Sequence, residues 1–500
     1  MMEKATKEVL AKFDELVEKR IAEIRATKDE IKVSGTVYYV STSGNDDNDG
    51  KTPKTPWKSL AKVSEAELAP GDGVCFKRGD LFRGGIKAKE GVTYFAYGEG
   101  EKPKFYGWDR SLDNPEQWTL FDKEHNIWKL NEPILDCGTL VFNDGEAHCR
   151  KLIPSYRNGM FVCRDEETKP FILADEMTED LDLFCDIRVK WSDPNGQSKG
   201  ESFPVPIVDS ETMGDLYLRC DKGNPGEVFD TIEAVVKRAI FPTGAKIPGV
   251  TIDNICIKYA NFGITGGTHL HASNCEIGWI GGTIQHYFGT DPNYPQGRRG
   301  SVTRFGNAIE CYGACNDYVV DNCYFYQQYD AAVTHQITTN GKKYELKDVR
   351  YSNNVIDTSV YSVEYFLNQT DGDTESIIEN CEICGNIMTN AGYGWGQQRH
   401  NTHTPAHIKG WSYTNTARNF SIHDNVFYKS AYRLFHIVAE EETSLPTMYN
   451  NTYIQKYGMT LGQYGANKEK EPAILGFYPD AEEFIVETMG DKDAKVYYIE

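Results

Sequence analysis

The sequence predicts an all-β solenoid, a right-handed parallel β-helix with an N-terminal capping helix and a β-rich insertion. Three observations lead to this prediction: a short unit ending in asparagine that recurs through the second half of the chain, a polar strand that follows each recurrence, and an opening segment of strands and Gly/Asp-rich turns. A chain of 500 residues would ordinarily suggest about three domains, but repeat folds do not follow that rule.

The recurring unit is the strongest of these signals. It consists of two apolar residues separated by one position, then one or more polar or small residues, then asparagine. The asparagines are Asn254, Asn274, Asn322, Asn354, Asn386, Asn425 and Asn451. Asparagine tolerates the left-handed backbone conformation, so it suits the bend between two strands, and stacked asparagines can form a ladder. A β-propeller would require an even spacing of about 40 residues, so the uneven spacing favours the solenoid.

The rest of the chain divides around these coils. Residues 1–35 are predicted to contain an amphipathic helix that covers the exposed end of the solenoid, with a coiled-coil or membrane-surface helix as the alternative. Residues 36–109 are assigned to the first coils, 110–247 to a β-rich insertion, 248–480 to the main coils and 481–500 to a C-terminal end segment. The apolar face of the helix comprises Val9, Leu10, Phe13, Leu16, Val17, Ile21 and Ile24.

Charge and composition exclude several classes of partner. The formal net charge of −21 disfavours nucleic acid, because phosphate binding depends on clustered Lys and Arg. It also weakly disfavours a highly anionic polysaccharide, unless a local basic groove overrides the global sign. The first 30 residues contain no apolar signal segment and no stretch is apolar enough to span a bilayer, so we expect no membrane partner and a cytoplasmic protein. The oligomeric state stays open.

The 13 cysteines are scattered along the chain, and we expect reduced thiols that pack in the core. Cys381 and Cys384 have the spacing of half a zinc site, but no second pair accompanies them. Packing thiols are therefore favoured, and neither a metal nor a cofactor is expected.

The strands that follow the bends carry the candidate catalytic residues. These residues are Glu310, Asp330, His335 and Glu364. Alternation along a strand places Glu310, His335 and Glu364 on the outer face when Ala332 points inward. Glu310 and Glu364 are then two coils, or about 9–10 Å, apart. Asp330 lies near a bend, so its direction is less certain.

Further polar and aromatic side chains are expected on the same face, where they would contact a substrate. The predicted substrate-binding residues are Tyr365, Trp395, Gln398, Arg399, His407 and Arg433. His400, His403 and His407 could also be read as metal ligands. A substrate-contacting or exposed loop is favoured, because no acid or cysteine is near them in the sequence.

This combination suits cleavage of a glycosidic bond, which needs one carboxyl group protonated and another ionised. Crowded acids repel one another, and this repulsion separates their pKa values. Carboxyl groups about 5–5.5 Å apart suit retaining chemistry and groups about 6.5–9.5 Å apart suit inverting chemistry. The sequence permits both.

Two parts of the chain resemble known proteins. Residues 37–83, with their Gly/Asp-rich turns, are similar to the opening of pectate-lyase-like β-helix proteins. The segments 306–310, 329–336, 362–365 and 394–399, in this order, resemble β-helix glycoside hydrolases. The resemblance implies a hydrolase with an oligo- or polysaccharide substrate, but it assigns no roles to the individual acids.

Two other functions stay open. A polysaccharide lyase or uronate epimerase would need a base such as His335 or Tyr365, and Arg399 or a bound Ca²⁺ to neutralise the substrate carboxylate. The third hypothesis is a non-catalytic glycan-binding or structural β-helix.

Overall fold

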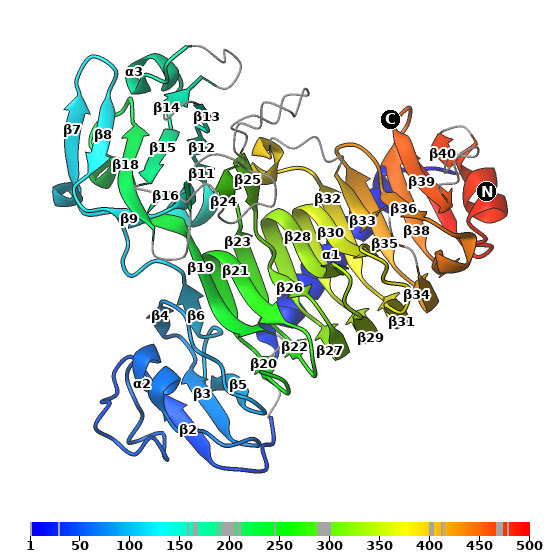
Figure 1. Cartoon of the computed structure of the whole chain (residues 1–500), viewed down its shortest axis with the longest axis horizontal. Helices are drawn as coiled ribbons and strands as arrows, with labels where there is room; N and C mark the ends of the chain where they lie inside the picture. Colours follow the sequence, from blue (N-terminus) through cyan, green and yellow to red (C-terminus); the bar gives the residue numbers. More distant parts are fainter. Residues whose placement is uncertain are drawn as a thin grey trace.

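The computed structural model describes residues 3–28, 31–157, 160–163, 169–187, 190–191, 206–207, 212–244, 247–287, 302–399, 405–411, 414, 416–466, 474–477 and 480–500. The protein is mostly β, with two large sheets in which most neighbouring strands are parallel (Figure 1). This confirms the predicted fold class at the level of a β-rich protein with parallel sheets.

A ten-stranded sheet forms one side of the molecule. Each of its strands pairs in parallel with the next one in chain order. The strands are β2 (Val37–Val40), β3 (Gly73–Lys77), β5 (Thr93–Tyr97), β20 (Thr251–Asp253), β22 (His271–Ser273), β27 (Cys315–Asp321), β29 (Glu345–Ser352), β31 (Ile377–Cys384), β34 (Ala417–His423) and β37 (Thr447–Tyr449).

A nineteen-stranded sheet forms the remaining sides. Its strands in the second half of the chain are β21 (Cys256–Gly266), β23 (Glu276–Ile280), β26 (Ile309–Tyr312), β28 (Tyr324–Thr338), β30 (Val355–Asn368), β32 (Ile387–Ala391), β33 (Ala406–Gly410), β35 (Val426–Ser430), β36 (Phe435–Ala439), β38 (Thr452–Lys456), β39 (Thr460–Ala466), β40 (Ile474–Phe477) and β41 (Lys495–Ile499). The long strands β28 and β30 bend at Gln327 and Thr358, which have positive φ, so each strand belongs to two successive ladders.

We call one pass of the chain through both sheets a coil. Apolar side chains from every coil meet in one continuous core between the sheets.

The bend asparagines behave in two ways. In the first three units the asparagine itself, for example Asn274, has positive φ. In the later units the residue before it occupies the left-handed conformation, and the asparagine that follows is buried. The left-handed residues of these later bends are Asn353, Gly385, Asp424 and Asn450.

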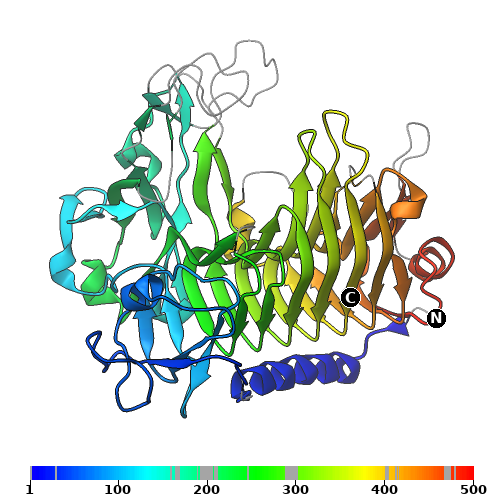
Figure 2. The same cartoon turned by 60° about the horizontal axis from the view of Figure 1, so that its bottom comes forward.

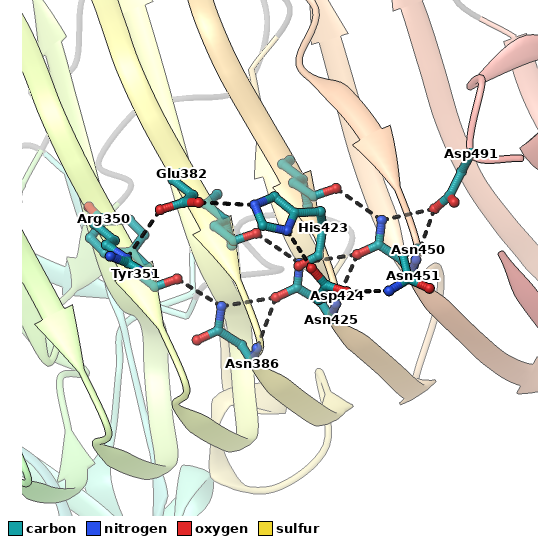
Figure 3. A network of polar contacts seen from close by, with 12 residues as sticks. Arg350, Tyr351, Glu382, Asn386, His423, Asp424, Asn425, Asn450, Asn451 and Asp491 are labelled. Carbon is teal, nitrogen blue, oxygen red and sulfur yellow. Dashed lines mark hydrogen bonds and ion pairs between the residues drawn. The ribbon is translucent and has the colours of Figure 1, made fainter. Parts of the chain in front are cut away.

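The buried asparagines form the expected ladder. Asn354 donates from Nδ2 to Asn386 Oδ1 over 2.9 Å, and the same contact is repeated from Asn386 to Asn425 and from Asn425 to Asn451. Asp491 ends the ladder by accepting from Asn451 over 2.9 Å (Figure 3). Each amide group thus satisfies polar groups of the next coil inside a core where water cannot do so.

Asn386→Ala is expected to lower the free energy of unfolding by about 3 kcal/mol, because it leaves two buried polar groups of the preceding coil without this partner. The groups are the Tyr351 carbonyl, which accepts from Asn386 Nδ2, and the Asn354 backbone N–H, which donates to Asn386 Oδ1. Urea denaturation measures the change. Asn316→Ala, at an exposed position of β27, is the control and should change stability by less than about 0.5 kcal/mol. Equal effects of the two substitutions would contradict a structural role for the ladder.

The N-terminal helix α1 (Lys7–Ala26) begins after Thr6, whose side chain accepts from the Val9 backbone N–H. It does not cover the first coil, as the sequence suggested, but lies lengthwise along the coils (Figure 2). Ile24 packs against Tyr324 and Val355. The preceding strand β1 (Glu3–Lys4) pairs with β41 of the last coil. The apolar face of the helix thus packs against side chains from neighbouring strands of the large sheet.

The insertion between the first and the main coils has its own core. Its antiparallel strands are β7 (Trp118–Asp122), β8 (Ile127–Leu130), β15 (Asp182–Ile187) and β18 (Met213–Arg219). Two further strands, β10 (Cys137–Phe142) and β19 (Ile232–Gly244), join this unit to the large sheet, where β19 pairs with β21. The insertion projects beyond the coils (Figure 1).

All 13 cysteines are free and buried, as expected for packing thiols. Among the described residues, no helix combines the length and apolarity needed to cross a membrane.

Candidate active site

A row of polar side chains crosses five neighbouring strands of the large sheet. The parallel register aligns Glu310 on β26, Thr334 on β28, Glu364 on β30, Lys409 on β33 and His436 on β36. We call this row the polar ladder. Glu310 and Glu364 stand two steps apart, as predicted, and Thr334 lies between them.

Glu364 is the most strongly perturbed acid of the ladder. Its side chain is buried, and its Oε1 accepts from the indole Nε1 of Trp411 over 2.7 Å. Burial raises the pKa of Glu364 to about 8, and the charge of Asp330 adds to this effect. Arg399, the Trp411 hydrogen bond and Lys409 oppose the rise only in part. Glu364 is therefore protonated at neutral pH and can donate a proton.

Asp330 lies on β28, four residues before Thr334, and has a different partner from Glu364. It forms a buried ion pair with Arg399, which also lies 5.6 Å from the ring centre of Tyr361. Burial raises the pKa of Asp330 above its ordinary value, whereas the charge and the hydrogen bond of Arg399 lower it. The guanidinium thus favours the ionised carboxylate, whereas burial favours the protonated form.

Glu310 is the third acid. Asn307 donates to its carboxylate from Nδ2, and Asn307 Oδ1 in turn accepts from the Ala331 backbone N–H over 2.9 Å. Burial raises the pKa of Glu310 to about 7, against the lowering effect of this hydrogen bond and with a small contribution from Asp330. The side chain of Asn307 therefore ties Glu310 to the strand that carries Asp330.

Lys409 and His436 were not among the residues predicted from the sequence. Lys409 Nζ lies 3.2 Å from His436 Nδ1 and 4.0 Å from the ring centre of Trp411. Burial and the charge of Arg433 lower the pKa of Lys409 to about 7. Burial and the charges of Lys409 and Arg433 lower the pKa of His436 to about 2. Aligning the strand Ala406–Gly410 with Glu364 would have revealed Lys409, but this register depends on loop lengths.

Arg433, a predicted substrate-binding residue, lies at this end of the ladder. It is buried, and its Nη1 donates to Gln463 Oε1 over 3.1 Å. Gln463 on β39 is the next step of the same register after His436. Arg399 and Arg433 are thus the two predicted binding residues that the structure brings to the site.

The prediction that His335 faces outward with the acids is wrong. His335 is fully buried and aligned with Cys311 and Tyr365, and its Nδ1 lies 3.0 Å from the Tyr351 hydroxyl. Burial lowers the pKa of His335 to about 3. Ala332 and Val333 both belong to the core, so the alternation that would have turned His335 outward is broken, and Thr334 lies beside Glu364.

Tyr365 is likewise a core residue and not a sugar-stacking surface. Its ring is stacked on His335 at 5.8 Å and packs edge-on against Phe420 at 4.9 Å. It follows Glu364 directly, so it points to the opposite side of the strand.

Trp395 and Gln398 were predicted to contact substrate, but they hold the backbone before Arg399. They lie in the 3₁₀ helix η3 (Trp395–Gln398). Trp395 is fully buried and donates from Nε1 to the Gln327 carbonyl over 2.8 Å. Gln398 binds the insertion by donating to the Cys149 carbonyl over 2.8 Å and accepting from the Lys151 N–H. The two residues therefore position Arg399 against Asp330.

His407 is also buried, with Ser362 Oγ 3.1 Å from Nδ1 and the Lys429 carbonyl 3.0 Å from Nε2. The prediction that it contacts substrate is therefore wrong in this structure, because both ring nitrogens have partners within the protein. His400 and His403 lie outside the described residues.

Comparisons with known proteins give a partial match in sequence and distant likenesses in structure. No family model matches the chain. An alignment of 82 positions, which covers 14% of this chain, is 40% identical to a lacto-N-biosidase from Bifidobacterium longum subsp. longum. The match covers 5% of that protein, so this chain spans only a small part of the curated relative.

Solved structures show distant likenesses. The complex of XylC with xylose is 13% identical, with a TM-score of 0.41 and coverage of 93% of this chain and 83% of XylC. A glycoside hydrolase is 11% identical, with a TM-score of 0.41 and coverage of 86% and 94%. The GH136 lacto-N-biosidase from Eubacterium ramulus is 12% identical, with a TM-score of 0.28 and coverage of 90% and 67%. Glycoside hydrolases, which segments of the sequence resemble, are thus among the proteins to which this chain is similar.

Proposed function

We propose that this chain is a glycoside hydrolase built on a right-handed parallel β-helix, and that it cleaves a glycosidic bond of an oligo- or polysaccharide at the polar ladder. The observation that carries the proposal is the contrast between two buried acids, of which one acts electrostatically on the other. The pKa of Glu364 is raised to about 8, while Asp330 is paired with Arg399. One carboxyl group kept protonated beside one kept ionised is what this chemistry needs. The short match to a lacto-N-biosidase supports the same class.

In this mechanism Glu364 donates its proton to the oxygen of the leaving group. The carboxylate of Asp330 stabilises the positive charge that develops at the anomeric carbon, either by attacking that carbon or by activating a water molecule. Arg399 lowers the pKa of Asp330 and so favours its ionised form, and the charge of Asp330 in turn raises the pKa of Glu364. Glu310 is a third acid beside the pair, available to bind a sugar hydroxyl or a water molecule.

The two residues that the sequence suggested as the base of a lyase are not accessible to a substrate. His335 and Tyr365 are packed in the core, and Arg399 is paired with Asp330 instead of being available for a substrate carboxylate. A lyase abstracts a proton next to such a carboxylate, so these two features favour hydrolysis. A non-catalytic glycan-binding protein would differ from a hydrolase in binding the glycan without forming a product.

The function is tested by assaying the full chain on a panel of aryl glycosides, natural oligosaccharides and lacto-N-biosides. Hydrolysis, with the anomeric form of the first product followed by NMR, would support the proposal and show whether configuration is retained. An ultraviolet-absorbing unsaturated product from a uronate polymer would identify a lyase instead. Saturable glycan binding without any product would identify a binding protein.

The pH dependence of kcat/KM reports the proton on Glu364. Because the acid acts in its protonated form, activity should fall as pH rises above about 8. Trp411→Phe removes a hydrogen bond that lowers this pKa, so the alkaline limb should move to higher pH. The measurement is kcat/KM from about pH 6 to about pH 10.

Trp118→Phe serves as the control, because this indole donates to the Leu112 carbonyl within the insertion. Its alkaline limb should coincide with that of the unmodified protein. A limb that stays in place in Trp411→Phe, or moves to lower pH, would contradict the role of Glu364.

A further inference from the structure

The outer face of the ten-stranded sheet carries a cluster that the proposed hydrolase does not use. Glu382 and Cys384 lie on β31, and the register pairs Cys384 with His423 on β34. Among the residues that the structure describes, these three bring a thiol, an imidazole and a carboxylate within 4.8 Å of one another. Cys381 belongs instead to the core, 3.9 Å from His335, because a spacing of three residues reverses the direction of the side chain.

The imidazole of His423 is fixed between two carboxylates (Figure 3). Its Nδ1 lies 2.6 Å from Asp424 Oδ2, and its Nε2 lies 3.1 Å from Glu382 Oε1. A carboxylate only accepts hydrogen bonds, so Nδ1 carries the proton that is shared with Asp424. In the neutral imidazole, Nε2 then directs a lone pair at a second acceptor, and this contact requires either a further proton or a metal ion between the two atoms.

The neighbours of the cluster hold it in the arrangement of a metal site. Asp424 also accepts from Asn450 Nδ2, and the ring of Tyr449 is stacked on His423 at 4.3 Å with an interplanar angle of 7°. A histidine that donates from one nitrogen to a carboxylate while its other nitrogen is available is the usual arrangement of a histidine metal ligand. Arg350 binds Glu382 Oε2 over 3.1 Å, and Oε1 faces His423.

A proton alone would satisfy His423 and Glu382 but would make no use of the thiol. Cys384 is mostly buried, on the same face as Glu382 and beside His423. Sulfur, nitrogen and oxygen ligands in one cluster match the preference of Zn²⁺, whereas Ca²⁺ and Mg²⁺ prefer oxygen ligands alone.

We propose that Cys384 Sγ, His423 Nε2 and Glu382 Oε1 bind a Zn²⁺ ion, with a water molecule as the fourth ligand. Zinc–ligand distances of about 2.0–2.3 Å place ligand atoms roughly 3–4 Å apart, so small side-chain movements complete the site. The Cys384 thiol loses its proton to the solvent as the metal binds, so affinity increases with pH. The ion joins β31 to β34 and therefore links two successive coils.

The test uses the full chain after treatment with a chelator. Calorimetric titration with Zn²⁺ should show one bound ion, and binding should raise the melting temperature. Titration with Co²⁺ should produce the near-ultraviolet charge-transfer absorption of a cobalt–thiolate bond. Cys384→Ser and His423→Gln should each weaken Zn²⁺ binding at least about tenfold, and Asp424→Asn about tenfold through its hydrogen bond to His423.

The matched control is His271→Gln, because His271 also pairs with a carboxylate, Asp317, over 2.9 Å on the same sheet. This substitution should leave zinc affinity unchanged.

Absence of saturable Zn²⁺ binding to the unmodified chain would overturn the proposal, as would a stoichiometry and affinity unchanged in both Cys384→Ser and His423→Gln. In that outcome His423 Nε2 and Glu382 Oε1 are joined by a hydrogen bond and not by a metal ion. The polar ladder lies in the other large sheet, so this result would leave the proposed hydrolase activity unaffected.

Discussion

Glu364→Gln is expected to lower kcat/KM at least about a hundredfold on substrates with a poor leaving group, because general acid catalysis contributes about 10²- to 10⁴-fold. Glutamine keeps the size of the side chain and can still accept from Trp411 Nε1, but it has no acidic proton. The loss should shrink on aryl glycosides whose leaving group departs without protonation. Steady-state kinetics on a series of aryl leaving groups measures this dependence.

Asp330→Asn separates the two roles. If Asp330 stabilises the developing charge, its loss should lower the rate on good and poor leaving groups alike. Glu375→Gln, at an exposed acid of the loop before β31, is the control and should leave kcat/KM unchanged. Full activity in both Glu364→Gln and Asp330→Asn, with the fold verified by circular dichroism, would refute the assignment of the site.

Arg399→Met is expected to lower the free energy of unfolding by about 3–5 kcal/mol at neutral pH, because it leaves the buried carboxylate of Asp330 without its counter-charge. Arg110→Met is the matched control. The ion pair of Arg110 with Glu132 has side chains that are 49% and 65% exposed, so its loss should cost less than about 1 kcal/mol. Equal effects of the two substitutions in urea denaturation would contradict a buried pair.

The pH dependence of this destabilisation has a definite sign. Arg399 lowers the pKa of Asp330, so its removal raises this pKa further in the folded state, while the unfolded value stays at about 3.9. The folded variant then binds more protons than the unfolded chain between these two pKa values, and its stability falls as pH rises through this interval. The defect should therefore be smallest in acid, and Asp330→Asn combined with Arg399→Met should recover much of the lost stability.

Several features of this site could be predicted from the sequence. Glu310, Asp330 and Glu364 were recognised because acids recur in strands that otherwise alternate between apolar and small residues. The separation of Glu310 and Glu364 by two steps followed from counting coils, and the register confirms it. These inferences are local, since they need only the strand period and the bend that precedes each strand.

The errors at the site have a common physical cause. His335 and Thr334 are adjacent, and because Ala332 and Val333 both enter the core, Thr334 rather than His335 lies beside the acids. Because side chains alternate with a period of two, a shift of one residue exchanges the two faces of the strand. Trp395, Gln398 and His407 form hydrogen bonds with residues that are distant in the sequence. A local sequence pattern does not predict these partners.

The repeated strands, their bends and the acids they carry follow from the amino-acid sequence alone, because strand alternation and the conformational freedom of asparagine act over a few residues. The folded protein adds three pairings: Arg399 with Asp330, Lys409 next to Glu364 in the ladder, and Cys384 with His423. These pairs form across coils separated by loops of unequal length, and burial between coils sets the charge of each group. The chemistry of the site therefore depends on the register of the coils, which no single strand contains.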